Sequence, residues 1–476
     1  MSLKFGTSGL RGLSADLEGP ASALYATAFA RHLLASGLAG EGDEVLVGRD
    51  FRPSSPAISA IAIAALRKAG LSPRDCGALP TPALALLALS RKAACLMVTG
   101  SHIPADRNGI KFYRPDGEID KADEVAITAA ADGIRAEGLV LDGAGETAED
   151  LHDAALSLYM SRNRTLLPER ALAGLRIGVY QHSTVARDLF VTVLGHYGAD
   201  VVALGRSESF IPVDTEAVSG ETIALFRDWT VQHGLAAIVS ADGDGDRPLI
   251  ADETGTPLRG DLVGLIASCF LGATTIATPV TSNSGIEAAV AGKVLRTKVG
   301  SPFVIAAMNE AVAAGETAVA GFEANGGTLT ATSFTVNGHR LAALPTRDSL
   351  LPVLAVLALA AGEKEPLSML ASRFALPAAA SDRLENIAVQ TSAALMAELR
   401  SGAGALAAFL APIGVPARVS DIDGLRVTLE SGAIIHFRPS GNAPEMRCYV
   451  EAADDAAAAR LLEAGLQRIH EWALNR

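Results

Sequence analysis

The chain has 476 residues, more than a single hydrophobic core usually holds, so we expect three or four domains of about 100–200 residues each. Hydrophobic residues make up 49% and charged residues 20%, which is typical of a folded globular protein and excludes a disordered one. The net charge of −13 argues against a nucleic-acid partner, because sequence-independent binders carry a basic face.

The cysteines and the first residues of the chain indicate where in the cell the protein is located. The chain has no CxxC spacing, so a zinc or redox motif has no support among Cys76, Cys95, Cys269 and Cys448. The opening MSLKFGTSGLRG is too polar for a signal peptide, and no strongly apolar stretch reaches about 18 residues. We therefore expect a soluble, cytoplasmic protein with no membrane partner.

Short Val/Ile/Leu runs alternate with Ala/Leu-rich segments along most of the chain. Apolar residues at helical spacing predict helices at 21–34 and 55–69. The apolar runs predict strands at 45–47, 94–98, 175–180, 201–204, 235–240 and 319–321. Strands that alternate with helices predict α/β units with mostly parallel sheets, buried on both faces.

The last section has a different pattern. Two strands at 424–429 and 433–437 flank the turn Glu430-Ser431-Gly432, and a helix follows from about residue 454. This order is typical of an α+β domain. Breaks near 142–149, 252–257 and 361–366 predict domains at 1–150, 151–255, 256–370 and 371–476.

Functional residues of α/β sheets gather at the carboxyl ends of strands. After the run at 235–240 come Asp242, Asp244 and Asp246, whose like charges repel unless a cation neutralises them. An EF-hand loop is excluded, because Arg247 stands where the loop needs glycine and a strand precedes it. Three carboxylates suit Mg²⁺, and the alternative is a solvated acidic turn.

The other strand ends carry three further polar loops. TGSHIPADRNGIK at 99–111 supplies Ser101 as a possible nucleophile and Lys111 as a possible proton carrier, while His102 has the alternative of bonding local backbone. The FEANGG loop at 322–327 can clasp vicinal sugar hydroxyls through Glu323 and Asn325. RPSGNAPEMR at 438–447 suits a phosphate dianion. Taken singly, the last two also fit ordinary turns.

Together these loops resemble, in order and over nearly the whole chain, the motifs of the α-D-phosphohexomutase family. This family includes phosphomannomutases, phosphoglucomutases and phosphoglucosamine mutases. Residues 5–12 resemble its amino-terminal signature, 99–104 its phosphoserine loop, 242–247 its metal loop, 321–327 its sugar loop and 438–442 its phosphate loop. The resemblance implies three related α/β domains and a smaller fourth domain around a central cleft.

The resemblance also implies a mechanism. Ser101 carries a phosphoryl group, passes it to a hexose phosphate, and recovers the other phosphate of the bisphosphorylated sugar. It implies one Mg²⁺ per chain, held by Ser101, Asp242, Asp244 and Asp246, with a hexose 1,6-bisphosphate as activator. The catalytic residues it implies are Ser101, Lys111, His102, Arg247 and Arg11. The substrate-binding residues are Glu323, Asn325, Arg438, Ser440, Gly441, Asn442, Arg447 and Ser301, and the last domain acts as a lid.

Four positions depart from the family pattern. Gly100 replaces an alanine, Ile103 replaces an asparagine, Asn325 stands where serine is common, and Ser301 stands where histidine often occurs. The loop combination favours phosphomannomutase, with phosphoglucomutase and phosphoglucosamine mutase as alternatives. A non-catalytic sugar-phosphate-binding relative and a serine-dependent phosphatase are further alternatives, and the sequence does not predict the oligomeric state.

Overall fold

The computed structural model describes residues 3–6, 9–139, 141, 144–440 and 444–474. The chain forms two compact units. Unit 1 comprises Met1–Ala277 and Gly300–Arg373, and unit 2 comprises Thr278–Val299 and Phe374–Arg476. The predicted domain boundaries after residues 150, 255 and 370 stay predictions.

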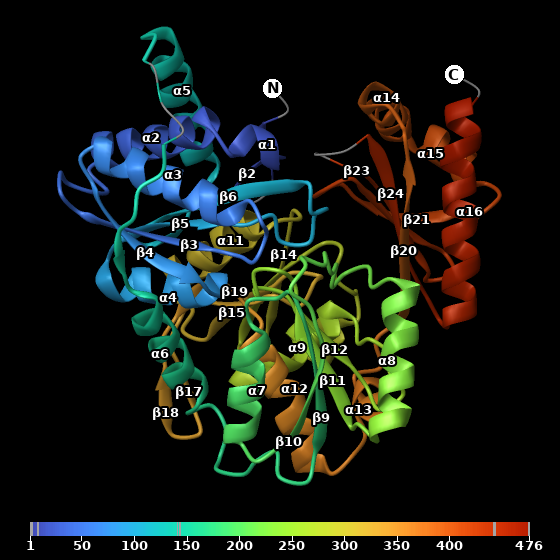
Figure 1. The fold of residues 1–476 in the computed structure, drawn as a ribbon. Coiled ribbons are helices and arrows are strands. Elements are labelled where there is room, and N and C mark those ends of the chain that lie inside the picture. The colour runs from blue at the N-terminus through green and yellow to red at the C-terminus, as the bar shows by residue number, and fades with distance from the viewer. Residues whose placement is uncertain (1–2, 7–8, 140, 142–143, 441–443, 475–476) are drawn as a thin grey trace. The chain divides into compact units, whose positions relative to one another are not determined.

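The first sheet of unit 1 carries the amino-terminal strands. Its order is β1 (Lys4–Gly6), β2 (Gly9–Leu13), β6 (Arg107–Arg114), β5 (Ala94–Val98), β3 (Glu44–Arg49), β4 (Ser72–Ala78) and β8 (Glu149–Asp150), with β7 (Gly117–Glu118) beside β6. β5, β3, β4 and β8 pair with one another in parallel. The pairs that involve β1, β2, β6 and β7 are antiparallel, including the pair of β5 with β6. The sheet is therefore mixed (Figure 1), and of its parallel strands β3 and β5 contain the predicted runs 45–47 and 94–98, whereas β4 and β8 were not predicted.

Helices cover this sheet on both faces. Ala94, Leu96 and Val98 of β5 belong to the core beneath α2 (Pro20–Ala35), α3 (Ser55–Lys68) and α5 (Lys121–Ala136). Cys95 points instead toward α4 (Thr81–Arg91), where it lines a small cavity with Ala85 and Ala88. Burial on both faces explains why β5 reads as an unbroken apolar run. Two further helices of this region are α1 (Ser14–Leu17) and α6 (His152–Asn163).

Two more sheets complete unit 1. One has the order β10 (Asp200–Arg206), β9 (Arg176–His182), β11 (Ala237–Ala241) and β12 (Pro248–Ala251), with α7 (Arg187–His196) and α8 (Gly220–His233) between its strands. The other includes β13 (Thr275–Pro279), β15 (Val319–Phe322), β16 (Thr328–Thr330) and β19 (Leu344–Asp348). Its helices are α9 (Gly260–Leu271), α11 (Ser301–Ala313), α12 (Leu350–Glu363) and α13 (Leu367–Arg373), and β17 (Phe334–Val336) pairs with β18 (His339–Leu341).

Unit 2 contains an antiparallel sheet with helices on one face. Its order is β20 (Ala378–Glu385), β24 (Glu445–Ala452), β23 (Ile434–Pro439), β22 (Leu425–Leu429) and β21 (Pro416–Ser420). Leu425, Val427 and Leu429 alternate into a core shared with α14 (Val389–Arg400), α15 (Ala403–Leu410) and α16 (Asp455–Leu474). The segment 278–299 adds α10 (Ile286–Ala289) and β14 (Lys293–Thr297).

The predictions of mixed α/β sheets and an α+β carboxyl-terminal region are confirmed. β5 has the predicted bounds, and α3 and α16 begin within one residue of the predicted starts. Among the described residues no single helix is both long and apolar enough to span a membrane, although the bent pair Val389–Arg400 and Ala403–Leu410 meets those criteria when taken together.

Candidate active site

The serine loop, residues 99–107, leaves the end of β5 and returns into β6. Ser101 has a backbone φ of 54°, a left-handed conformation that non-glycine residues rarely adopt. The buried guanidinium of Arg52 stabilises this loop by donating hydrogen bonds to four of its carbonyl oxygens. These belong to Ser101 (3.0 Å), Ile103 (2.6 Å), Pro104 (2.7 Å) and Arg107 (2.8 Å).

A second set of contacts fixes the backbone of Ser101 itself. Its N–H donates to the Thr99 hydroxyl over 2.8 Å, and that hydroxyl donates to Asp50 Oδ2 over 2.8 Å. Asp50 also accepts from the Arg52 N–H and the Ser55 hydroxyl. The strained residue is thus held by a network with almost no exposure to solvent, as expected of a functional position.

The acidic loop, residues 242–247, connects β11 to β12. Asp242, Asp244 and Asp246 are completely buried, and one oxygen from each lies within 4.8 Å of the others. The loop closes when the N–H groups of Asp246 and Arg247 donate to Asp242 Oδ1 over 3.1 and 3.2 Å. Its position between two strands of a hairpin confirms that it is not an EF-hand loop.

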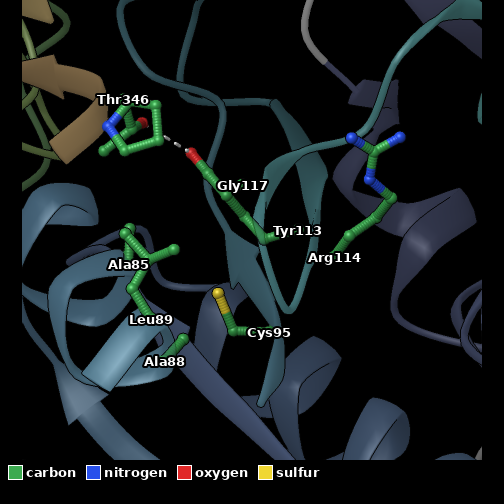
Figure 2. A pocket seen from close by; sticks show the side chains of 9 residues that line it. Ala85, Ala88, Leu89, Cys95, Tyr113, Arg114, Gly117 and Thr346 are labelled. Atoms are coloured by element: carbon green, nitrogen blue, oxygen red, sulfur yellow. Dashed lines mark hydrogen bonds between the residues drawn. The ribbon is translucent and has the colours of Figure 1, made fainter. Parts of the chain in front are cut away.

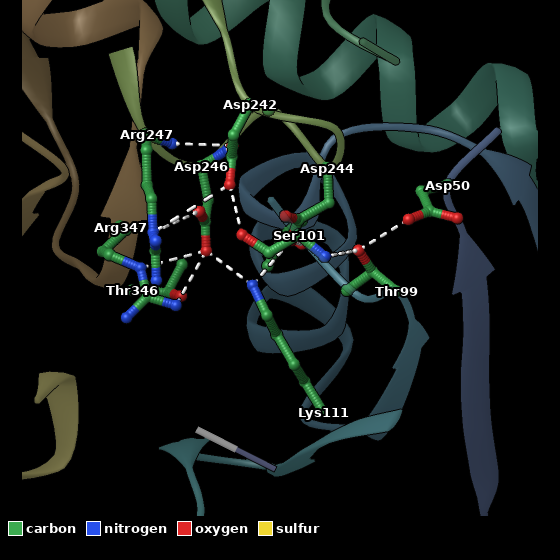
Figure 3. Close-up of polar contacts among 12 residues, drawn as sticks. Asp50, Thr99, Ser101, Lys111, Asp242, Asp244, Asp246, Arg247, Thr346 and Arg347 are labelled. Atoms are coloured by element: carbon green, nitrogen blue, oxygen red, sulfur yellow. Dashed lines mark hydrogen bonds and ion pairs between the residues drawn. The ribbon is translucent and has the colours of Figure 1, made fainter. Parts of the chain in front are cut away.

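Each of the three carboxylates uses one oxygen for structure. Asp244 Oδ2 accepts from Thr81 Oγ1 and from Lys111 Nζ, and Asp246 Oδ2 accepts from Lys111 Nζ over 2.6 Å. Asp244 Oδ1 and Asp246 Oδ1 are buried without any hydrogen-bond partner from the described residues. Asp242 Oδ2 accepts from the Ser101 hydroxyl (Figure 3). Two unpaired buried carboxylate oxygens beside a third, next to a serine, fit a divalent metal ion.

Burial and neighbouring charges set the protonation of this cluster. Burial and the adjacent Asp244 and Asp246 raise the pKa of Asp242 well above its usual value. For Asp246, burial opposes ionisation, but Arg347 and Lys111 outweigh it and hold the pKa far below the usual value. Burial also disfavours the charged form of Lys111, yet Asp244 and Asp246 raise its pKa overall. Lys111 is therefore held as an ammonium ion.

His102 and two arginines lie around the serine. His102 Nδ1 is 2.7 Å from Arg247 Nη1 and 3.3 Å from Ser101 Oγ. Burial and the charge of Arg247 lower the pKa of His102 to about 3, so the imidazole is neutral and accepts from the guanidinium. On β2, burial together with Arg247 and Arg347 lowers the pKa of Arg11 to about 10. Thr7 and Ser8 of the same signature lie outside the described residues.

The sugar loop, residues 322–327, contacts the metal cluster through Arg347. Glu323 Oε2 accepts from Arg347 Nη1 over 2.7 Å, and the same guanidinium donates to Asp246 Oδ2. Asn325 Oδ1 accepts from the Gly327 N–H over 3.0 Å, so its carbonyl serves the loop itself. The residue Ser301 is fully buried, and its hydroxyl donates to Glu118 Oε2 over 2.7 Å.

The predicted phosphate loop belongs to unit 2. Arg438 and Arg447 lie directly opposite each other on β23 and β24. Arg438 Nε is 3.0 Å from Asp423 Oδ2, Arg447 donates to Glu445 Oε1, and the N–H of Ser440 donates to the Glu445 carbonyl. Gly441 and Asn442 lie outside the described residues. The two arginines are thus neighbours across the strand pair that leads into this loop.

A small cavity lies behind the strand that carries Lys111. It has a volume of about 10 Å³, room for about one water molecule, and the Tyr113 hydroxyl at its edge contacts Thr346 Oγ1 over 3.4 Å (Figure 2). Its lining is mostly apolar and includes Cys95 and Leu89. The cavity is a packing defect next to the site, not a place for a sugar.

Sequence reasoning missed several residues that hold the site together, chiefly Arg52, Thr81 and Arg347. The partners that they hold in the site loops lie 24 to 163 positions away along the chain, so no local motif predicts these contacts. A usable signal was available for Arg52. Arg52 lies two residues after Asp50, at the carboxyl end of a predicted strand. Functional residues of α/β sheets gather at such strand ends, so the two charged residues there could have been examined as candidates.

Comparisons with known proteins agree with this geometry. Models of phosphoglucomutase/phosphomannomutase match domain I (alpha/beta/alpha) at residues 2–137, domain III (alpha/beta/alpha) at 260–376 and the C-terminal domain at 384–466. A phosphomannomutase of Sinorhizobium fredii is 56% identical, with 98% of each chain covered. One of Salmonella muenchen is 42% identical, covering 98% of this chain and 95% of the relative.

The fold has solved counterparts. A phosphoglucomutase/phosphomannomutase family protein from Burkholderia thailandensis superposes with a TM-score of 0.73 at 22% identity, over 98% of this chain and 97% of that one. The likeness extends over the whole length, as the ordered motifs predict. The chain belongs to the α-D-phosphohexomutase family, the phosphoglucomutases and phosphomannomutases.

Proposed function

We propose that this protein interconverts mannose 6-phosphate and mannose 1-phosphate through a phosphorylated Ser101. One observation carries the proposal: the Ser101 hydroxyl lies on Asp242, beside two unpaired buried carboxylate oxygens and the Lys111 ammonium. A turn with no chemistry to perform would not bury three carboxylates and leave two oxygens unpaired. The phosphomannomutase relatives favour mannose as the sugar.

The reaction conserves phosphate. A sugar hydroxyl attacks the phosphorus on Ser101, the Oγ–P bond breaks and a new P–O bond forms on the sugar, while the proton lost by the sugar hydroxyl is balanced by one gained at Ser101 Oγ. The resulting mannose 1,6-bisphosphate returns its other phosphoryl group to Ser101, and this restores the enzyme. A hexose 1,6-bisphosphate would serve as the activator that first phosphorylates the serine.

Several residues have distinct tasks in this scheme. Asp242 through Oδ2, with Asp244 and Asp246 through Oδ1, would hold one Mg²⁺, which neutralises charge on the phosphoryl oxygens. Lys111, kept protonated by its two aspartates, is suited to donate a proton to an oxygen that leaves phosphorus. His102, being neutral, orients Arg247 instead of carrying charge.

The remaining assignments concern recognition. Glu323 would accept hydrogen bonds from sugar hydroxyls, and Arg438, Ser440, Asn442 and Arg447 would bind the phosphate that is not being transferred. With those contacts the carboxyl-terminal domain would act as a lid that excludes water from phosphoserine. Asn325 and Ser301 are weaker candidates, since both side chains already bond within the protein. A cytoplasmic location completes the proposal.

The test is a single assay that measures isomerisation and phosphate release together. Mannose 1-phosphate, glucose 1-phosphate and glucosamine 1-phosphate are supplied separately with Mg²⁺ and the matching bisphosphate. We expect isomerisation of mannose 1-phosphate with the highest kcat/KM and no net release of phosphate. Release of phosphate would identify a phosphatase, and binding without turnover would identify a non-catalytic relative.

A further inference from the structure

Arg347 is a completely buried cation in contact with both the acidic loop and the sugar loop. Its Nε and Nη2 donate to Asp246 Oδ2 over 3.0 and 2.8 Å, while its Nη1 donates to Glu323 Oε2 over 2.7 Å. The side chain is 1% exposed. One planar group thus joins a proposed metal ligand to a proposed sugar ligand, and Figure 3 shows its contact with the metal ligand Asp246.

The protein fixes Arg347 from both sides along β19. The preceding Thr346 donates to Glu118 Oε1 over 2.8 Å, and the following Asp348 accepts from the Tyr159 hydroxyl over 2.6 Å. The strand therefore cannot slide without breaking buried hydrogen bonds, which are costly to lose. The base of the Arg347 side chain is as well defined as its tip.

The sugar loop is shaped around the same side chain. A Cβ added at Gly327 would lie 2.7 Å from Cδ of Arg347, far inside normal contact. Glycine at this position lets the loop pass directly over the arginine. The contact between loop and arginine is thus built into both the ion pair and the packing.

The guanidinium also selects which oxygens remain available. With Arg347 and Lys111 both on Asp246 Oδ2, Asp246 Oδ1 is left buried without a hydrogen bond from the described residues, and only Arg247 Nε approaches it, at 3.8 Å. With Arg347 on Glu323 Oε2, the Oε1 atom of Glu323 has no hydrogen bond from the described residues. In each carboxylate, one oxygen is fixed by the arginine and the other is left for a ligand.

We propose that Arg347 is a positioning residue that sets the metal ligand Asp246 and the sugar ligand Glu323 in a fixed mutual geometry. The inference rests on the proposed function and extends it. Phosphoryl transfer needs the sugar hydroxyl close to and in line with the phosphoserine. A rigid link between the metal side and the sugar side supplies that alignment before the substrate arrives.

The test measures two affinities by titration calorimetry on the dephosphorylated protein: Mg²⁺ alone, and mannose 6-phosphate alone. Arg347→Lys keeps the charge but replaces a planar fork by a single ammonium, which cannot hold both carboxylates. We expect both affinities to fall by roughly tenfold or more, because each loses an ordered partner. The kcat of this variant should fall and its KM should rise.

Arg187→Lys is the matched control. Arg187 is another buried arginine of unit 1 that donates to carbonyls, those of His182 and Ser207, and it contacts neither Asp246 nor Glu323 among the described residues. Both affinities should stay within about twofold of the unaltered protein, which is a small free-energy change. The thermal unfolding curve of each variant shows whether it is folded, and so whether a lower affinity comes from altered positioning or from a loss of folded protein.

Gly327→Ala is the second variant, in case Arg347→Lys does not fold. It changes no charge but displaces the arginine, so both affinities should fall together, by less than in Arg347→Lys. The inference is overturned if a folded variant loses only one affinity, or if it melts earlier but binds both ligands normally. A wild-type protein that binds neither mannose 6-phosphate nor glucose 6-phosphate would instead overturn the proposed function.

Discussion

The serine loop is held through its backbone, whereas the acidic loop is held through its side chains. Arg52 bonds four carbonyl oxygens of the first loop and leaves the Ser101 and His102 side chains unrestrained by it. Lys111 and Arg347 bond carboxylate oxygens of the second loop. A nucleophile must exchange its proton for a phosphoryl group, so Arg52 holds the backbone and leaves the Ser101 hydroxyl to contact Asp242. A metal ligand must stay in place, so one of its oxygens is fixed.

This difference predicts which property a substitution in each loop should change. Disturbing Arg52 should misplace the nucleophile without changing the metal ligands, because none of its hydrogen bonds reaches a triad carboxylate. Disturbing the acidic loop should change metal affinity first. Substitutions in each loop test whether the two effects are separate.

Ser101→Ala should lower turnover of mannose 1-phosphate by roughly a thousandfold or more, because no other group in the loop carries phosphorus. The fold should persist, since the loop is held by Arg52. Turnover with added bisphosphate and the protein's intact mass, which should show no phosphoprotein, are the measurements. Ser101→Gly is the control: it is equally inactive but at least as stable, because glycine tolerates the positive φ. Near-normal activity in either variant would contradict the assignment.

Asp244→Asn should weaken Mg²⁺ binding by about ten- to a hundredfold, since a neutral amide replaces one of three charges that attract a hard cation. Calorimetry with Mg²⁺ measures this. Asp252→Asn is a suitable control, because Asp252 is a buried carboxylate of the turn after β12 that bonds Thr254 and lies outside the triad. Equal losses in both variants would mean that the triad has no special role.

Arg52→Lys should lower kcat by about tenfold and leave the Mg²⁺ affinity unchanged. A lysine has three donors on one atom and cannot reach four separated carbonyls, so the loop loses buried hydrogen bonds of about 0.5–1.5 kcal/mol each. Arg49→Lys serves as the control, since Arg49 pairs with Asp75 at a partly exposed position. A loss of Mg²⁺ affinity in Arg52→Lys would break the separation between the two loops.

The smallest expected effect concerns pH and the start of the acidic loop. His182 Nε2 bonds the carbonyl of Ala241, just before Asp242, and burial lowers the pKa of His182 from 6.5 to about 4. Above pH 6.5 the residue is neutral in both states. Below pH 6.5, His182 takes up a proton in the unfolded chain but stays neutral in the native state. Stability should therefore fall by up to about 1.4 kcal/mol per pH unit between pH 6.5 and 4.

Denaturant unfolding at several pH values measures this slope. His182→Gln should give a shallower dependence than the unaltered protein over the same window, because the substituted residue takes up no proton. His436, whose pKa burial also lowers to about 4, lies in unit 2 and provides a comparison outside the site. If the pH dependence of stability is unchanged in His182→Gln, then His182 does not contribute to it.

Sequence reasoning succeeded where the physics is local. The run 94–98 predicts β5 because burial on both faces demands apolar residues throughout, and the glycine-separated aspartates predict a cation site because like charges need one. It failed where a partner comes from far away. Nothing near Arg347 in LPTRD distinguishes a buried bridging arginine from an exposed one.

The predicted role of Asn325 shows a second limit. Its departure from the usual serine suggested a sugar contact, yet its Oδ1 bonds the Gly327 N–H. Asparagine often closes a turn on a backbone N–H two residues later, and sequence alone does not distinguish that use from ligand binding. The residue's part in sugar choice stays a prediction.

The hydrogen bond from Ser101 to Asp242 has a consequence for the enzyme's two chemical forms. The Ser101 hydroxyl has a proton to donate to Asp242 Oδ2, whereas the ester oxygen Oγ of a phosphoserine has none. Losing the phosphoryl group thus covers a metal-facing oxygen with the enzyme's own hydroxyl, and regaining it uncovers that oxygen. The dephosphorylated and phosphorylated enzymes should therefore bind the metal with different affinities. A preparation that has lost its phosphoryl group in the absence of activator should start with one metal-facing oxygen occupied by the Ser101 hydroxyl.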